Sequence, residues 1–249
     1  MRDQNANQPE NWHIRRVSET GSTNTDLLQE GAQGAPDRSV LRSDYQSAGR
    51  GRLDRAWEAP RGANLLVSML FRQVPVHTHV LTQVVALAAA RVARETCGVN
   101  VVMKWPNDLL VNNEKVAGIL AQAGSLDARG VPAFVVVGIG LNLQWAPPGA
   151  TSLAASGWTH AMNPDEFLVS MLPCIDELLA LSVEQMHDRY VAELGTVGMR
   201  VRAELPHNQE IVGRATGVEV DGRLIVLDEC GVTHRIDTAD VVHLRPVVD

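Results

Sequence analysis

The stretch from residue 99 to residue 122, VNVVMKWPNDLLVNNEKVAGILAQ, decides the class of fold. Three apolar runs in it, Val99–Lys104, Leu109–Val111 and Val116–Gln122, predict strands. The residues Asn112-Asn113-Glu114, between the second and third runs, are typical of a tight turn. We therefore predict three consecutive strands of a sheet, with a polar segment between the first two.

Helical patterns alternate with strand patterns on both sides of this stretch. The clearest helix is predicted over His79–Thr96, where apolar residues recur at helical spacing and Gly98 follows. Further helices are predicted over Thr25–Glu30, Asp165–Leu181 and Val183–Glu193, and further strands over Ile14–Val17, Ser39–Tyr45, Ala63–Phe71 and Ala133–Gly138. Strands with intercalated helices predict a main domain of the α/β class.

The pattern changes after Gly195. From Met199 onward, short alternating runs are separated by tight turns, and Asp221-Gly222 between two such runs strongly indicates a hairpin. These all-β residues predict a small barrel appended to the main domain. The expected organisation is a flexible N-terminus over residues 1–13, a main domain over residues 14–195 and the barrel over residues 196–249.

Charge and cysteine content exclude several classes of protein. The chain has 22 Lys+Arg against 29 Asp+Glu, a net charge of −7, which counts against non-specific nucleic-acid binding. The first residues lack the apolar stretch of a signal peptide, and the longest uncharged run, residues 73–90, is too polar to span a bilayer. The three cysteines are far apart and fit neither a disulfide framework nor a zinc knuckle. We expect a reduced cytoplasmic protein without membrane or nucleic-acid partners.

The segment Gln46–Trp57, QSAGRGRLDRAW, is unlike an ordinary solvated loop. Gly49 and Gly51 allow the backbone to approach a ligand closely, and the interleaved arginines can direct guanidinium groups at one anion. With Arg61 they form a local cationic patch on an acidic protein. A merely exposed arginine-rich loop is the alternative. The spacing matches neither the P-loop nor the dinucleotide-binding glycine pattern.

Two further segments place polar residues or glycines against apolar strands. In Lys104-Trp-Pro-Asn-Asp108, followed by Lys115, cations, an amide and a carboxylate lie near a predicted core, where such groups need partners. A plain turn is the alternative for the first of these, and a solvated strand edge for Lys115. Gly138-Ile-Gly140, at the end of a predicted strand, again permits backbone contact with a ligand, with close packing as the alternative.

Taken together, these motifs resemble those of the biotin protein ligases in order and spacing. The resemblance covers the chain from about residue 14 to the end and rests on Ser22-Thr23-Asn24, Gln46…Trp57, Lys104–Asp108, Lys115-x-Ala-Gly-Ile and Gly138-x-Gly-x-Asn142. It implies a catalytic domain like that of class II synthetases, α/β (α+β), with a central mixed β-sheet flanked by helices, and an SH3-like C-terminal barrel. Few residues precede the first predicted strand, so the type without an N-terminal DNA-binding domain is expected.

The resemblance implies an ATP-dependent ligase with two reaction steps. Biotin and Mg²⁺-ATP would give biotinyl-5′-AMP, and the biotinyl group would pass to a lysine of the biotin carboxyl carrier domain of acetyl-CoA carboxylase. A lipoate– or octanoate–protein ligase of related fold and a non-catalytic biotin sensor are the alternatives. Homodimerisation through the sheet, which occurs in parts of the family, stays open.

The resemblance also implies roles at the biotin end. The residues expected to line the biotin pocket are Ser22, Thr23, Asn24, Gln46, Gly49, Arg50, Gly51, Lys115, Gly118, Gly138 and Gly140. The side chains of residues 22–24 and Gln46 would hydrogen-bond the ureido ring and the sulfur end. Gly138 and Gly140 would admit the ring by close backbone approach, and Arg50 would meet the carboxylate and the α-phosphate.

At the nucleotide end the expected residues are Arg52, Arg55, Trp57, Lys104, Asn107, Asp108, Lys115 and Asn142. Arg52 would hold the adenylate, Arg55 would reach pyrophosphate, and Lys115 would neutralise the α-phosphate. Arg50, Arg52, Lys115 and Asp108 are the expected catalytic residues, with Asp108 hypothesised to accept the proton of the incoming lysine. Asp54 replaces a glycine common in the family, and its carboxylate is expected to pair with a neighbouring arginine and weaken the grip of Arg55 on phosphate.

Overall fold

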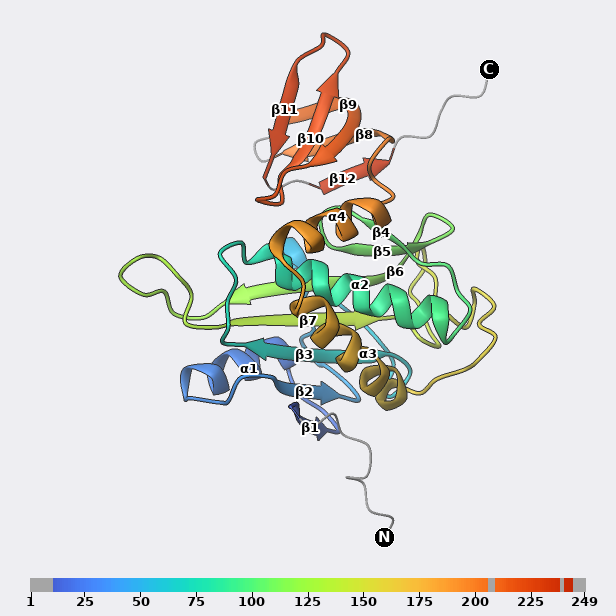
Figure 1. Ribbon diagram of the computed structural model, residues 1–249. Helices are drawn as coiled ribbons and strands as arrows, with labels where there is room; N and C mark the ends of the chain where they lie inside the picture. Colours follow the sequence, from blue (N-terminus) through green and yellow to red (C-terminus); the bar gives the residue numbers. More distant parts are fainter. Residues whose placement is uncertain (1–10, 206–208, 238–239, 244–249) are drawn as a thin grey trace.

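The computed structural model of the chain describes residues 11–205, 209–237 and 240–243 and is built around two β-sheets. The larger sheet has seven strands in the order β1-β2-β3-β7-β6-β5-β4 (Figure 1). Its strands are β1 (His13–Val17), β2 (Ser39–Ser43), β3 (Leu65–Phe71), β4 (Val102–Lys104), β5 (Asp108–Val111), β6 (Glu114–Ala123) and β7 (Val135–Leu141). Only the β1–β2 pair is parallel, so the expected mixed sheet is confirmed.

The helices cover the two faces of this sheet unequally. On one face lie α2 (His79–Glu95), α3 (Pro164–Leu179) and α4 (Val183–Glu193), packed on a continuous apolar core (Figure 1). On the other face lies the shorter α1 (Thr23–Ala32), whose Leu27 packs in a small separate cluster with apolar residues of the sheet. The second face therefore keeps room for a ligand beside α1.

The side chains that alternate between the two faces of β7 and β3 explain where the space beside α1 lies. On β7 the residues facing α2 and α3 are all large and buried, while the alternate residues change from Val136 to Gly138 and Gly140. On β3, Leu70 packs under α1, and the next residue on the same face is the small Ser68, which pairs with Gly138. Small and polar residues on this face therefore hollow out the sheet next to α1.

Several element boundaries differ from those predicted. The first helix begins at Thr23 rather than Thr25, and the strand predicted from Val99 begins only at Val102. The strand predicted to end at Gly138 continues to Leu141, because it pairs with β3 on one side and β6 on the other through that residue. Gly138 and Gly140 thus lie inside a strand rather than at its end.

The expected flexible N-terminus needs a correction at its last residues. Residues 1–10 lie outside the described part of the chain, but Trp12 is buried and His13 already begins β1. The Trp12 ring packs edge-on against Phe71, and its Nε1 donates to Asp176 Oδ2 over 3.0 Å. Burial of an indole against α3 holds the chain in place before the predicted first strand.

The C-terminal sheet has five antiparallel strands in the order β11-β10-β9-β8-β12. They are β8 (Arg200–Leu205), β9 (Gln209–Val218), β10 (Leu224–Asp228), β11 (Thr233–Ile236) and β12 (Asp240–His243). The predicted Asp221-Gly222 hairpin joins β9 to β10, with Gly222 at a φ of +90° that favours glycine. Elsewhere, all three cysteines are free, and no helix in the described ranges is long and apolar enough to cross a membrane.

Candidate active site

A cavity of about 450 Å³ occupies the hollowed face of the large sheet beside α1. Its wall contains all the residues predicted for the site except Gly49: Ser22, Thr23, Asn24, Gln46, Arg50, Gly51, Arg52, Arg55, Trp57, Lys104, Asn107, Asp108, Lys115, Gly118, Gly138, Gly140 and Asn142. Gly49 lies just behind this wall, where a Cβ would come 2.5 Å from the Trp57 carbonyl oxygen. The fold therefore brings five separate sequence segments to one cavity.

One end of the cavity is a network of short polar side chains. The Thr23 hydroxyl donates to Gln46 Oε1 over 2.9 Å, and the Thr23 backbone N–H donates to the same oxygen over 2.8 Å. Ser22 occupies the N-cap position of α1, but its side chain makes no capping hydrogen bond and lines the cavity instead. Helix capping therefore does not account for the Ser-Thr-Asn motif.

Two members of this network were missed at the sequence level. Ser68 donates to Asn24 Oδ1 over 2.6 Å, and Asn24 Nδ2 donates to Gln122 Oε1 over 2.8 Å. Ser68 is fully buried in the otherwise apolar strand LLVSMLF, and that lone hydroxyl was the available signal. Gln122, on the exposed stretch of β6, gave no comparable signal.

The arginine loop, residues 46–63, folds back on itself along the cavity. Gly51 N–H donates to Arg55 O over 2.7 Å, and Trp57 N–H donates to Gly49 O over 2.9 Å. At the inner side, Arg52 Nη1 donates to Asn107 Oδ1 over 3.2 Å. The loop therefore presents its arginines from a closed hairpin rather than from an extended surface segment. The expected pairing of Asp54 concerns a side chain outside the described part of the structure.

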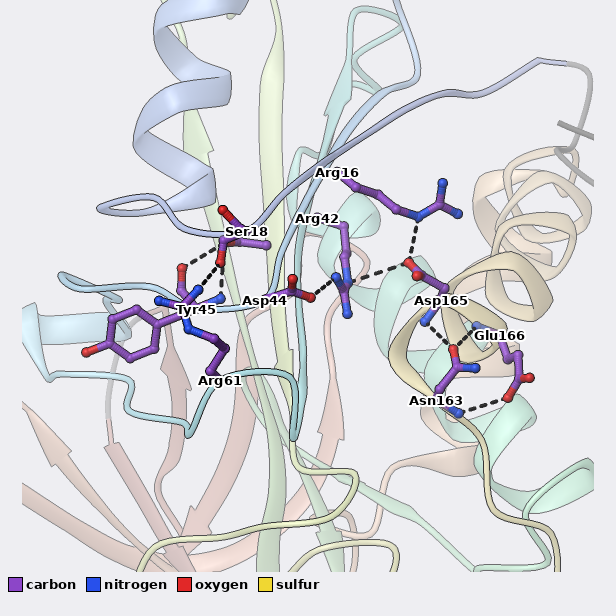
Figure 2. Close-up of polar contacts among 10 residues, drawn as sticks. Arg16, Ser18, Arg42, Asp44, Tyr45, Arg61, Asn163, Asp165 and Glu166 are labelled. Carbon is purple, nitrogen blue, oxygen red and sulfur yellow. Dashed lines mark hydrogen bonds and ion pairs between the residues drawn. The ribbon is translucent and has the colours of Figure 1, made fainter. Parts of the chain in front are cut away.

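Arg61 anchors the returning end of this loop (Figure 2). Its Nη1 donates to Ser18 O over 2.6 Å, its Nη2 pairs with Glu19, and its guanidinium lies 5.2 Å from the centre of the Tyr45 ring. These partners immediately precede the Ser22-Thr23-Asn24 and Gln46 positions along the chain. Arg61 thus ties the loop to both segments that supply the polar end.

The Trp57 indole forms the part of the cavity wall that lies over β6 and β7. It covers Gly118 and Gly140, whose missing side chains leave the space that the ring fills. Its Nε1 is buried and has no hydrogen-bond partner among the described residues. A buried donor without a partner costs about 1–3 kcal/mol, so a ligand atom that accepts from this N–H would be stabilised. The predicted approach of the ligand to Gly138 and Gly140 stays a prediction.

Beyond Trp57 lies an ion pair at the cationic end. Lys115 Nζ is 2.7 Å from Asp108 Oδ1 and 5.7 Å from the centre of the Trp57 ring. Asn107 holds this region to β6, because its Nδ2 donates to Ile119 O and its carbonyl accepts from Ile119 N–H. Lys104 lies opposite Asp108 in the backbone register of β4 and β5. The segment Lys104–Asp108 therefore forms both the turn and the part of the cavity wall that were predicted as alternatives for it.

Asn142 is buried, and both ends of its amide are in use. Its Oδ1 accepts from Asn64 Nδ2 over 3.1 Å, and its Nδ2 donates to Thr151 O over 3.1 Å. Asn142 thus holds residues 142–152 in place, and this segment brings Pro147 and Ala150 to the cavity wall. Its predicted contact with the nucleotide stays a prediction.

The C-terminal sheet completes the wall with Glu204 and Val241, which sequence reasoning did not find. It is held against the Lys104–Asp108 segment by Trp105, whose Nε1 donates to Gly222 O over 2.9 Å and whose backbone N–H donates to Thr196 Oγ1 over 3.0 Å. No short-range sequence signal links a hairpin at residue 222 with a tryptophan at residue 105.

A second groove, of about 630 Å³, runs from the same segment toward the hairpin. The His79 ring faces Gly222 there. Burial and the nearby His77 lower the pKa of His79, while Asp221 opposes them by raising it. The groove shares Arg52, Trp105 and Asn107 with the main cavity. Among the described residues, no group of three or more His, Cys, Asp or Glu side chains could hold a metal ion.

Comparison with known proteins agrees with this arrangement. Residues 15–142 match the biotin/lipoate A/B protein ligase family, and residues 196–244 match the biotin protein ligase C-terminal domain. The first match contains every segment that contributes to the cavity from the large sheet except residues 147–150. The second contains Glu204 and Val241.

Individual relatives cover nearly the whole chain. The biotin–[acetyl-CoA-carboxylase] ligase of Mycobacterium tuberculosis is 37% identical over 98% of this chain and 94% of its own length. The corresponding ligase of Paracoccus denitrificans is 32% identical over 92% of each chain. The biotin protein ligase of Aquifex aeolicus in complex with biotin and ATP shares the fold, with a TM-score of 0.79, 24% identity and coverage of 93% of this chain and 99% of that one.

Proposed function

The chain belongs to the biotin/lipoate A/B protein ligase family, and from that premise we propose that it is a biotin protein ligase. It activates biotin with ATP as biotinyl-5′-AMP and transfers the biotinyl group to a lysine of the biotin carboxyl carrier domain of a carboxylase. Its relatives in Mycobacterium tuberculosis and Paracoccus denitrificans are named as ligases of acetyl-CoA carboxylase, which supports that carboxylase as the acceptor.

The observation that carries the proposal is the polarity of the main cavity along β7. Its polar end lies at Gly138, beside Asn24, and its cationic end lies at the Gly118–Gly140 pair of β6 and β7, beside Lys115 and the arginine loop. Two residues of strand separate Gly138 from Gly140, about 7 Å at roughly 3.3 Å per residue. Such a cavity suits a ligand with a polar ring at one end and an anion at the other.

In the first step, an oxygen of the biotin carboxylate attacks the α-phosphorus of ATP, and the bond to pyrophosphate breaks. Two anions must meet, so Arg50, Arg52 and Lys115 offset their repulsion by charge and position. A carboxylate nucleophile needs no general base, so orientation is the main requirement. Mg²⁺ enters as part of the Mg²⁺-ATP substrate, with phosphate oxygens as ligands and few from the protein.

In the second step, the neutral lysine amine of the carrier attacks the acyl carbon, and AMP leaves with the bonding electrons of its oxygen. One oxygen of Asp108 pairs with Lys115, so its other oxygen is available to accept the proton that the amine loses. Lys115 in turn stabilises the negative charge that develops on the acyl and phosphate oxygens.

The polar end favours biotin over lipoate or octanoate. The buried Thr23, Asn24 and Ser68, together with the half-buried Gln46, form a set of donors and acceptors. Such a set matches a cyclic urea, whereas an alkyl or dithiolane end could not hydrogen-bond with it. The sensor alternative predicts loss of the catalytic cations. Arg50, Arg52 and Lys115 all line the cavity.

The domain organisation belongs to the same proposal. Residues 14–195 form the biotin- and ATP-binding domain, and residues 196–249 form the C-terminal domain that closes the cavity with Glu204 and Val241. The match of residues 196–244 to the C-terminal domain of biotin protein ligases supports this boundary. Dimerisation stays a prediction.

A transfer assay tests the function. Purified protein is mixed with labelled biotin, Mg²⁺-ATP and a biotin carboxyl carrier domain, and carrier-bound label is counted for the wild type and for Lys115→Ala. We expect incorporation that requires ATP and is lost in the variant. ATP-independent biotin binding without incorporation would instead identify a sensor, and labelled octanoate or lipoate on its own carrier domain tests the related ligases.

A further inference from the structure

Asn64 is a fully buried polar side chain that the proposed reaction does not use directly. It lies at the end of the arginine loop, immediately before β3. Its Oδ1 accepts from the backbone N–H groups of Leu143 and Trp145 over 3.1 and 3.2 Å. Its Nδ2 donates to Asn142 Oδ1 over 3.1 Å and to Trp145 O over 2.9 Å. Every hydrogen-bonding position of this amide is therefore directed at residues 142–145.

These bonds continue to the backbone of Lys115. Asn142 Nδ2 donates to Thr151 O, and Thr151 N–H donates to Lys115 O over 2.9 Å. A parallel bond, from Gln144 N–H to Ala63 O over 3.1 Å, reinforces the first junction. The chain of contacts thus runs from the exit of the arginine loop, through residues 142–152, to the strand that carries the cationic end.

The polar end of the cavity is independent of this chain. Thr23 bonds to Gln46 and Ser68, and Ser68 bonds to Asn24. None of these hydrogen bonds involves Asn64 or residues 142–152. By contrast, residues 142–152 supply Pro147 and Ala150 to the wall. Movement of this segment therefore changes the half of the cavity that holds Lys115.

We propose that Asn64 is a positioning residue of the adenylation step, which sets residues 142–152 and Lys115 in register with the arginine loop. The inference rests on the proposed ligase function, because it assigns the affected half of the cavity to the nucleotide. Asn64 touches no reacting atom. Its effect is on the binding of ATP and on the retention of biotinyl-5′-AMP, while the binding of biotin by the polar end is unchanged.

The variant Asn64→Asp tests this with little change in volume. It keeps both accepted bonds and turns both donated bonds into oxygen–oxygen contacts. We expect the KM for ATP to rise by about three- to thirty-fold, the range for losing one or two hydrogen bonds, and the adenylate to dissociate faster by a similar factor. The KM for biotin should stay within about two-fold of the wild-type value.

A pH series separates positioning from a general weakening of the fold. Burial raises the pKa of a carboxyl introduced at this site, and its protonated form can again donate one hydrogen bond to Asn142. The ratio of the variant KM for ATP to the wild-type value should therefore decrease between pH 8 and pH 6. Asn64→Ser, which carries no charge, is the second variant and should show the ATP-selective defect without this pH dependence.

The control is Asn163→Asp, which makes the same chemical change at the exposed N-cap of α3 (Figure 2). Aspartate caps a helix as well as asparagine, so both KM values should match the wild type. An unchanged KM for ATP in Asn64→Asp and Asn64→Ser, or an equal rise in both KM values, would overturn the inference. A wild-type protein that attaches no biotin to its carrier would instead overturn the proposed function.

Discussion

Replacement of Gly140 by alanine tests the packing of Trp57 on β7. A methyl group at Gly140 would lie 2.5 Å from Trp57 Nε1 and 2.6 Å from its Cζ2. Ordinary contact distances are about 3.5–4.0 Å, so the indole must move by roughly 1 Å or more. The backbone itself is no obstacle, because Gly140 lies inside β7 and has no positive φ. The substitution therefore acts through the ring rather than through strain in the strand.

The magnitude follows from the cost of overfilling a packed site. Inserting a methylene group into close packing costs about 1–3 kcal/mol, and that range corresponds to a factor of about 5 to 150 in a rate or binding constant. We expect kcat/KM for biotin adenylation, measured by ATP–pyrophosphate exchange, to decrease within this range. Gly217→Ala is the matched control, since its methyl group would meet only Ile225 Cδ1 at 3.7 Å.

A double-mutant cycle makes the test specific to the ring. With Trp57→Ala as the background, the added methyl group has no indole to displace, so Gly140→Ala should cause no further loss. Two results would contradict this role of the indole ring. One is Gly140→Ala with wild-type adenylation, and the other is an unchanged loss when Trp57 has been removed.

Three further perturbations test other parts of the structure. Asp108→Asn should slow the transfer of biotin from preformed biotinyl-5′-AMP to the carrier lysine by about 10²-fold or more in single-turnover assays. Transfer at the wild-type rate would exclude Asp108 as the proton acceptor. Arg61→Ala should raise the KM for biotin by about two- to five-fold with Tm nearly unchanged, because an exposed ion pair such as Arg61–Glu19 adds about 0.2–1 kcal/mol at most. The control Arg15→Ala breaks a similarly exposed pair with Glu30 and should change neither quantity, so equal effects of the two variants would contradict an anchoring role for Arg61. Because the pKa of His79 is lowered in the folded protein, the unfolded chain binds a proton more readily, and stability against urea should decrease as pH falls below about 6.5. His79→Gln should show a smaller decrease, and identical plots of stability against pH for the two proteins would exclude His79 as the cause.

The motifs were predictable because their chemistry is local. Glycines next to arginines, and a lysine beside Trp-Pro-Asn-Asp, are unusual enough at short range to mark a binding site and to resemble one family. The same holds for the Asp221-Gly222 hairpin and the helix over α2, where turn chemistry and periodicity act over a few residues. All these signals depend on neighbours in the chain.

The lengths of some elements were not predictable in this way. β7 continues through Gly138 and Gly140 because β3 and β6 pair with it on both sides, which outweighs the low strand preference of glycine. The N-terminal boundary shifted for a similar reason, since the contacts of Trp12 with Phe71 and Asp176 come from distant parts of the chain.

Local patterns in the sequence indicate which residue types take part in the site and in what order they occur along the chain. Which of them are in contact depends on the tertiary fold: Ser68 with Asn24, Trp57 over Gly140, Asn64 with Asn142, and Glu204 in the wall of a cavity formed mainly by another domain. The physical reason is that propensity and turn chemistry act over a few residues, whereas burial leaves each polar group in need of a partner that can come from any part of the chain.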